Sequence, residues 1–425
     1  MAKLLKEKLS SILPGLREEA KSIVKDHGKK NISEVTIDQL YGGMRGVKGL
    51  VCDTSEVGLD TGLIIRGIPI LELTGKLPEE VFYLLLTGAL PTAEELKDLK
   101  DSLAGRTELP KYVIDMLNAL PDDTHPMIML SSAMVAMGYD SKFRKAYTEG
   151  TAKGNLWEFM LEDCLDIIAK VPVLAAFIYR KRFGKGEMIQ PDKNLDWAAN
   201  YAKMLGIQDD NGKLADLMRL YMVLHSDHEG GNVSAFTTYT VGSALSDAYY
   251  AISAGLNGLA GPLHGLANQE CLAFIVKMRS DIGHPPTDEE VKNYCQKLLD
   301  SGRVIPGYGH AVLRVTDPRF TAFLDFGNES IPDDEIFKIV KQLFELVPPI
   351  LVEQGKAKDP WPNVDAGSGS MLYHYGLKEY EYYTVVFSVS RILGLSAQLI
   401  LARGMNASIV RPKSVSTDWV KKQIS

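Results

Sequence analysis

Histidine, aspartate and arginine side chains lie in or beside short segments that are rich in glycine and proline. Glycine lets the backbone approach a ligand closely, and functional residues concentrate on loops that a rigid scaffold holds. All five segments carry or adjoin a residue of these three types, and they are therefore candidate parts of one site. The segments span residues 41–49, 229–232, 255–265, 304–310 and 360–369.

The first candidate segment reads HSDHEGGN and spans residues 225–232. His225 and His228 would share a helix face, so a metal site is one interpretation, although the spacing is not the HExxH of metallopeptidases. A structural or capping role for one histidine is a second interpretation. Contact of at least one histidine with substrate is a third, because the following glycine pair would let an anion reach backbone N–H groups.

The second segment places His264 between a Gly/Pro turn and a stretch that reads as a helix. The positive end of a helix dipole favours a neutral imidazole. A neutral histidine can donate a hydrogen bond to a developing enolate. The alternative is a capping histidine on a packed turn.

The third segment runs VIPGYGHAVLR from Val304 to Arg314 and continues to Arg319. It offers exposed backbone amides, His310 and two arginines, whose planar groups bind carboxylate or phosphate in bidentate fashion. No clear strand precedes the Gly-x-Gly pattern, so a dinucleotide-binding fingerprint is not expected.

The fourth segment carries Asp365 in a proline-locked loop beside Trp361. Partial burial would raise the pKa of this carboxyl group toward that of a useful general base. The alternative is an aspartate that caps a helix or closes an Asx turn. Two further cations stand out, since Arg391 interrupts an apolar stretch and Arg411 begins an RPKS motif. Together these residues favour proton abstraction next to a carbonyl group in a substrate with several carboxylates.

Helices must position these segments, because apolar residues recur at helical spacing and helix caps are frequent. We expect a mostly α-helical chain with a small β element near the N-terminus, Val35–Leu40 and Leu63–Ile70 being the only fair strand candidates. Helices are expected from Pro78, Thr92, Thr287 and Pro332, over the N-terminal thirty residues, and at residues 125–138, 156–183, 194–206, 214–226, 240–257, 266–280 and 383–403.

Composition excludes several classes of protein. The 425 residues hold 47 Lys+Arg and 54 Asp+Glu, a net charge of −7 that argues against nucleic acid as a partner. A hydrophobic content of 45% and a charged content of 24% are ordinary for a globular protein. The four cysteines are far apart and are expected to be reduced.

No apolar run approaches the ~18 residues that cross a bilayer, the best being Val171–Tyr179, so no membrane partner is expected. The first thirty residues are lysine-rich and contain acids, unlike a transit peptide. We expect a cytoplasmic enzyme, or a mitochondrial matrix enzyme if the chain is a processed organellar form.

The segments HSDHEGGN, GLAGPLHGLAN, PGYGHAVLR and PWPNVD, together with YGGMRG and RPKS, resemble the signature segments of the citrate synthase family. The resemblance runs in order from about residue 30 to 420 and is to the eukaryotic, type I kind. It implies an all-α homodimer in which each subunit has a large helical domain, residues 1–266 and 374–425, and a smaller inserted helical domain, residues 267–373.

The activity that the resemblance implies is that of an acyltransferase of the tricarboxylic acid cycle. Acetyl-CoA and oxaloacetate would condense in a Claisen-type step, and hydrolysis of the thioester would release citrate and CoA. Acetyl-CoA is then a substrate, and neither a cofactor nor a metal is implied.

The resemblance also assigns roles to residues. Asp365 corresponds to the general base, His264 to the donor to the thioester oxygen, and His310 to the donor to the oxaloacetate carbonyl. Residues that correspond to ligands of oxaloacetate and citrate are His228, Arg319, Arg391 and Arg411, the last lent by the partner subunit. Residues that correspond to CoA ligands are Arg45, Arg314, Lys356, Val304, Gly307, Tyr308 and Gly309.

Three alternatives remain open at this point. A 2-methylcitrate synthase would use propionyl-CoA with the same residues, because one methylene discriminates by only ~1–3 kcal/mol. A catalytically inactive homologue would bind without turnover, and a metal-dependent lyase would lose activity to a chelator. One departure from the family stands in the catalytic segment: Gly367 replaces a frequent histidine, and we expect it to free the loop that carries Asp365.

Overall fold

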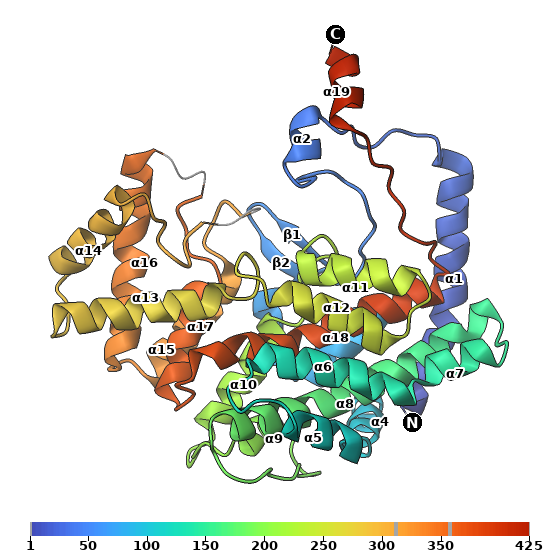
Figure 1. Cartoon of the computed structure of the whole chain (residues 1–425), viewed down its shortest axis with the longest axis horizontal. Helices are drawn as coiled ribbons and strands as arrows, with labels where there is room; N and C mark the ends of the chain where they lie inside the picture. Colours follow the sequence, from blue (N-terminus) through green and yellow to red (C-terminus); the bar gives the residue numbers. More distant parts are fainter. Residues whose placement is uncertain (1, 310–312, 356–358, 425) are drawn as a thin grey trace.

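The computed structural model describes residues 2–309, 313–355 and 359–424, so the predicted site residues His310 and Lys356 lie outside the described residues. The described part is mostly helical, as the sequence predicts (Figure 1). The helices of the N-terminal half are α1 (Lys3–His27), α2 (Ile37–Tyr41), α3 (Pro78–Thr87), α4 (Ala93–Ala104), α5 (Lys111–Asn118), α6 (Pro126–Met137), α7 (Lys142–Thr148), α8 (Leu156–Arg182) and α9 (Trp197–Leu205).

The C-terminal half contains a further ten helices among the described residues. They are α10 (Lys213–Leu224), α11 (Val233–Ser243), α12 (Ala248–Leu259), α13 (Ala267–Ile282), α14 (Asp288–Asp300), α15 (Pro318–Ser330), α16 (Glu335–Gln354), α17 (Asp365–His374), α18 (Tyr383–Gly404) and α19 (Thr417–Ile424). Short 3-10 turns lie at Ile70–Leu73, Gly138–Asp140, Lys153–Asn155 and Tyr380–Tyr382.

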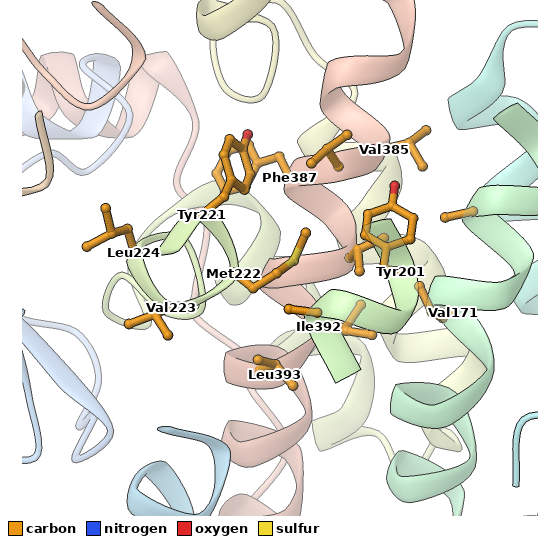
Figure 2. Packing of buried hydrophobic residues seen from close by; sticks show 14 of the residues in the cluster. Val171, Tyr201, Tyr221, Met222, Val223, Leu224, Val385, Phe387, Ile392 and Leu393 are labelled. Carbon is orange, nitrogen blue, oxygen red and sulfur yellow. The ribbon is translucent and has the colours of Figure 1, made fainter. Parts of the chain in front are cut away.

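The core is built around α18, which packs against α8, α10, α11 and α3. Figure 2 shows side chains of α8, α9, α10 and α18 meeting there, Met222 and Leu393 among them. The segment Tyr380–Gly404 is long and apolar enough to span a membrane, unlike any run that the sequence analysis singled out, but 83% of its most apolar window is buried. Burial of that extent is typical of a core helix.

A small antiparallel sheet lies near the N-terminus, as expected, in the order β1-β2-β3. The strands are β1 (Ser55–Gly58), β2 (Gly62–Ile65) and β3 (Ile68–Pro69). The expected strand Leu63–Ile70 is in fact two strands, because Arg66 and Gly67 adopt positive φ angles of 48° and 79° and reverse the chain. Strand β1 escaped prediction.

The second strand candidate, Val35–Leu40, is wrong. The Thr36 hydroxyl accepts a hydrogen bond from the backbone N–H of Gln39, whose side chain accepts one from the N–H of Thr36, and this capping box starts α2. Local caps satisfy the backbone here, which a lone strand would leave unpaired.

The expected helix 240–257 is two helices. α11 ends at Ser243, Leu245 adopts a φ of 65°, and Asp247 caps α12 by accepting from the N–H of Tyr250 at 3.0 Å. The two helices then pack against each other. The apolar spacing continues through the break, so periodicity alone did not reveal it.

Helices α13 to α17 form a group at the left of Figure 1. α17 packs against α13, α15 and α16, and α14 packs against α16. The group meets the rest of the chain through α10, which contacts α15 and α17, and through α13 and α18. The candidate site lies where these two sets of helices meet.

Candidate active site

His264 lies in a tight turn between α12 and α13. Its backbone N–H donates to the Gly261 carbonyl oxygen, and the N–H of Gly265 donates to that of Leu259, both at 3.0 Å. The turn packs on α18, because a Cβ at Gly265 would lie 3.0 Å from the Thr384 methyl group. The histidine therefore stands on a short, fixed loop.

Hydrogen bonding fixes the tautomer of His264. The backbone N–H of Ser234, which can only donate, points at Nε2 at 3.3 Å, and the Ser234 hydroxyl lies 2.9 Å from the same nitrogen. Nε2 is then the unprotonated nitrogen and Nδ1 carries the hydrogen. Burial, aided by the charge of Arg391, lowers the pKa of His264 to about 4, so the ring is neutral at neutral pH.

Asp365 is the first residue of α17 and is partly buried. Its backbone N–H donates to the Asn363 side-chain oxygen at 3.0 Å. The segment before it pairs with the glycine-rich loop: Asn363 N–H donates to the Gly307 carbonyl at 2.9 Å, and Gly309 N–H to the Trp361 carbonyl at 3.0 Å. The candidate base and the candidate CoA loop are thus one hydrogen-bonded unit.

The carboxyl group of Asp365 is tuned toward base chemistry. Burial raises its pKa to about 6, and the charge of Asp317 also raises it, whereas the charges of Arg319 and Arg391 lower it. A base with such a pKa is mostly ionised at neutral pH and still basic enough to take a proton. The expectation that burial raises this pKa agrees with the structure.

Arg319 and Arg391 are the two buried cations of this region, 4% and 2% exposed. Arg319 forms a bidentate pair with Asp317, with nitrogen–oxygen distances of 2.7 and 3.1 Å. Nε of Arg391 donates to the His225 carbonyl oxygen at 3.1 Å, and its guanidinium lies 4.7 Å above the Phe387 ring. Burial lowers the pKa of Arg391 to about 10, so it remains charged.

The Phe387 ring lies between His225, His264 and Arg391 and contacts all three. It contacts the rings of His225 and His264 edge-on, at centroid distances of 5.1 and 6.3 Å, besides lying under Arg391. His228 follows in the next loop, where its carbonyl oxygen accepts from Asn232 Nδ2 at 2.7 Å. Asn232 caps α11, the helix that carries Ser234 to His264.

Two residues of this cluster escaped a firm assignment from the sequence. His225 is buried, stacks on Tyr221 at 4.1 Å, and donates from Nδ1 to the Tyr221 carbonyl at 3.1 Å. Burial lowers its pKa to about 3, so Nε2 is an acceptor, and neither that nitrogen nor the Tyr221 hydroxyl finds a partner among the described residues. Tyr221 also feels the charges of Asp365 and Arg391. The sequence offered no signal for Tyr221, which reads as an ordinary position of an apolar helix.

The remaining predicted residues lie at the edge of the site or away from it. Arg314 is anchored next to the β1–β2 turn, its N–H donating to the Leu59 carbonyl at 2.9 Å, and Val304 is exposed. Tyr308 forms a β-bridge with Pro362. Arg45 lies in the exposed turn after α2, and Arg411 in the exposed chain between α18 and α19.

The expectation for Gly367 is wrong. Gly367 lies inside the first turn of α17, where it is buried, and a Cβ there would meet the Phe320 ring at 3.2 Å. It is a packing position within α17 and not part of the loop before Asp365.

The described cluster contains a base, a neutral imidazole with a free Nδ1–H edge, and two buried arginines. That set can remove a weakly acidic proton, stabilise the oxyanion that forms, and hold an anion. Within residues 2–309, 313–355 and 359–424, no group of three or more His, Cys, Asp or Glu is arranged to hold a metal ion.

Comparison with known proteins gives one consistent result. Residues 43–413 match the family model "Citrate synthase, C-terminal domain". A probable mitochondrial citrate synthase of Glossina morsitans morsitans is 48% identical over 431 residues, covering 99% of this chain and 92% of that protein.

Solved structures agree in fold. The citrate synthase of Pyrobaculum aerophilum superposes with a TM-score of 0.78 at 30% identity, covering 88% of this chain and 92% of that one. The citrate synthase of Thermoplasma acidophilum, solved with carboxymethyl coenzyme A and oxaloacetate, gives 0.76 at 23% identity, covering 91% and 96%. At that identity the second likeness concerns the fold alone.

Proposed function

The chain belongs to the citrate synthase family and is an enzyme of that type, and we propose that Asp365 and His264 carry out its proton abstraction. The reaction joins the acetyl methyl carbon of acetyl-CoA to the carbonyl carbon of oxaloacetate and then hydrolyses the thioester. The observation that carries the proposal is a carboxylate with a raised pKa in one cluster with a neutral histidine and two buried arginines.

The first step needs both groups at once. The methyl proton of a thioester is weakly acidic, so a carboxylate alone cannot remove it at a useful rate. Asp365 takes the proton while the Nδ1–H of His264 donates to the thioester oxygen, and stabilisation of the developing oxyanion lowers the barrier. A neutral imidazole suits this role, because an oxyanion receives its hydrogen bond without the histidine first losing a proton.

The second substrate is a dicarboxylate. Arg319 and Arg391 supply the charges that would hold its carboxylates, and His228 stays a predicted ligand. The His225 Nε2 acceptor and the Tyr221 hydroxyl donor lie in the same buried cluster and are available to bound substrate or water. His310 stays the predicted donor to the oxaloacetate carbonyl.

CoA would approach along the other side of Asp365. The loop with Val304, Gly307, Tyr308 and Gly309 presents its backbone beside the Asp365 segment, and Arg314 follows it directly. Arg45 and Lys356 stay predicted phosphate contacts. The bidentate-capable arginines suit phosphate oxygens.

We divide the chain into a large domain, residues 1–266 and 374–425, and a small one, residues 267–373. The packing of α13 to α17 on one another supports this division. His264 and Asp365 fall at its two boundaries, so rotation of the small domain would bring base and donor onto the substrate. Such closure would exclude water until the carbon–carbon bond has formed.

Exposed apolar side chains on two neighbouring segments, one around α2 and one at the C-terminal end, support a homodimer. Apolar side chains stand in solvent on the segment around α2 and on the C-terminal segment, and the Tyr41 hydroxyl joins the two through Thr417 at 3.4 Å. Exposed apolar surface of this kind marks an interaction site. The apolar residues are Ile37, Leu40, Tyr41, Met44, Val51, Val415, Trp419 and Ile424.

Two finer points stay predictions. The relatives named above support acetyl-CoA over propionyl-CoA as the substrate. The Glossina relative is described as a mitochondrial enzyme, whereas the sequence favours the cytoplasm or, for a processed form, the mitochondrial matrix. Fractionation of cells that express the native gene distinguishes the compartments.

The proposal is tested by following thiol release from acetyl-CoA and from propionyl-CoA with oxaloacetate, with a chelator in one arm. We expect faster release with acetyl-CoA, no effect of the chelator, and a fall of at least ~100-fold for His264→Ala. Wild-type turnover by His264→Ala would remove His264 from the mechanism. Absence of thiol release with either thioester would favour a binding homologue.

A further inference from the structure

A cavity of about 400 Å³ opens between α3, α4, α8 and α9, at the lower edge of the molecule in Figure 1. None of the candidate active-site residues lines it. The residues that line the cavity include Glu79, Lys97, Lys100, Asp101, Leu103, Pro172, Val173, Lys193, Trp197 and Met204. Cavities of a few hundred Å³ are the size of small-molecule sites.

The inner wall of the cavity is apolar and preformed. Leu103, Val173, Trp197 and Met204 are all buried, on three different helices that pack against α8 or belong to it. Trp197 is held in place, because its indole N–H donates to the Ile168 carbonyl oxygen at 2.8 Å. This wall suits a flat or branched apolar body.

A buried carboxyl group belongs to the same wall. Glu79 is 3% exposed, and its Oε1 accepts from the backbone N–H of Trp197 at 3.0 Å, while Oε2 finds no partner among the described residues. Burial raises the pKa of Glu79 to about 7. A buried carboxyl oxygen without a partner calls for an explanation, and a donor on a bound molecule would supply one.

The mouth of the cavity is cationic, although the chain carries a net charge of −7. Lys97 is neutralised by Asp101 at 2.5 Å. Lys100 and Lys193 also line the cavity, and no described residue forms an ion pair with either. The positive charge of Lys100 also acts on Glu79 and lowers the pKa of that carboxyl group. Two cations beside an apolar wall favour an anion with an apolar body.

We propose that this cavity is a second ligand site, which binds a small ring-bearing carboxylate or phosphate with one N–H donor. The ring packs on Trp197 and Val173, the anionic group meets Lys100 and Lys193, and the N–H donates to Glu79. The cavity shares no lining residue with the candidate active site.

The probe is indole-3-acetate, which carries all three features, titrated by calorimetry into the full-length enzyme saturated with oxaloacetate and CoA. We expect one site per chain. Affinity falls about tenfold for 1-methylindole-3-acetate, which lacks the N–H, and about tenfold for 3-methylindole, which lacks the carboxylate. Weak competition by sodium phosphate would show that the site also binds a phosphate group.

Variants locate the site. Lys100→Met weakens binding about tenfold, Lys100→Arg restores it, and Glu79→Gln, which keeps the acceptor for Trp197, removes the difference between the indole and its N-methyl analogue. Lys111→Met is the matched control, an exposed lysine of α5 paired with Asp115 and remote from the cavity wall. All four variants keep wild-type thiol release. The proposal is overturned by absence of binding at millimolar probe, by displacement with the active-site ligands, or by equal affinity for Lys100→Met and Lys111→Met.

Discussion

The carboxyl group of Asp365 and the imidazole of His264 are tuned in opposite senses by the same burial. Burial raises the pKa of the acid to about 6 and lowers that of the histidine to about 4. Between about pH 6 and pH 8 the pair therefore consists mostly of a carboxylate and a neutral imidazole. That is the pair of protonation states that proton abstraction beside a thioester requires.

The pH dependence of the reaction follows from these values. The base must be deprotonated, so kcat/KM is expected to rise tenfold per pH unit below about 6 and to level off above it, while His264 stays neutral throughout. The measurement is kcat/KM for acetyl-CoA from pH 5 to 8, with circular dichroism as a control for folding. A profile flat down to pH 5 would mean that Asp365 does not act as the base.

At the scale of elements, α17 carries the base Asp365, and the glycine-rich loop at Gly307 supports the start of this helix. The two elements must therefore keep a fixed position relative to each other. Gly307 has a φ of 81°, and a Cβ there would lie 2.8 Å from the Ala366 Cα. The close approach of these two backbones fixes where Asp365 begins its helix.

Gly307→Ala is therefore expected to lower kcat by ~100-fold, since a displacement near 1 Å costs about that much in a positioned reaction. The matched control is Gly302→Ala, which has the same positive φ of 80° but open space around its Cβ. It should lose about 1–2 kcal/mol of stability and keep its kcat. Equal activity of the two variants would show that this contact does not position the base.

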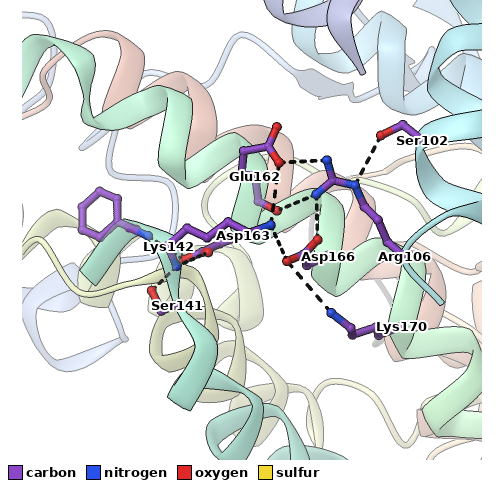
Figure 3. A network of polar contacts seen from close by, with 9 residues as sticks. Ser102, Arg106, Ser141, Lys142, Glu162, Asp163, Asp166 and Lys170 are labelled. Atoms are coloured by element: carbon purple, nitrogen blue, oxygen red, sulfur yellow. Dashed lines mark hydrogen bonds and ion pairs between the residues drawn. The ribbon is translucent and has the colours of Figure 1, made fainter. Parts of the chain in front are cut away.

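A second element-scale feature is the ion network that ties α8 to its neighbours (Figure 3). Arg106, after α4, binds Glu162 at 2.8 Å and Asp166 at 2.7 Å, and Lys142 of α7 binds Asp166 at 2.7 Å. The Arg106 side chain is only 13% exposed. Its charge is therefore far more costly to remove than that of a surface residue.

Arg106→Met should lower the free energy of unfolding by about 3 kcal/mol, because it leaves two largely buried carboxylates with fewer partners. Denaturant titration measures the change, and kcat should be unaffected. Lys111→Ala, which breaks an exposed pair, is the control and should leave the midpoint nearly unchanged. A loss no larger than that of the control would contradict the assigned role of the network.

At the scale of the whole molecule, Arg411 lies far from the site of its own chain. The N–H of Val410 donates to Ser243 Oγ at 3.0 Å, at the C-terminal end of α11, whereas Asn232 and His264 lie at the other end. Eleven helical residues span roughly 16 Å. If Arg411 binds substrate, as we propose, the partner subunit of the proposed homodimer would supply it.

Mixed dimers test this arrangement. Asp365→Asn and Arg411→Ala homodimers should each be nearly inactive, but a mixture refolded together should recover activity, because one of the two sites in a heterodimer then has both residues. Expected recovery approaches a quarter of the wild-type rate for random pairing, in which half of the dimers carry one intact site. Failure of a verified heterodimer to recover activity would place Arg411 in its own subunit's site, whereas full activity of the Arg411→Ala homodimer would place it outside catalysis.

Local sequence signals predicted most of the fold. Thr92 and Thr287 cap helices where expected, since a cap depends on only three or four residues, whereas the helix expected from Pro332 begins at Glu335. The signals failed at Leu245, where the apolar spacing continues through the break, and at residues 37–41, where a capping box starts a short helix in a stretch that reads as a strand. The site followed the same rule. Loop segments that combine Gly with His or Asp could be recognised in the sequence. Tyr221 could not, because only its packing against His225 brings it into the site.

The most direct test of the account is the turnover of Asp365→Asn, measured as thiol release from acetyl-CoA with saturating oxaloacetate. The substitution keeps the shape of the side chain and removes only its basicity. We predict a fall in kcat of ~100- to 10,000-fold, with oxaloacetate affinity within about threefold of wild type. A variant that turns over at the wild-type rate would show that another group takes the proton and would contradict the mechanism.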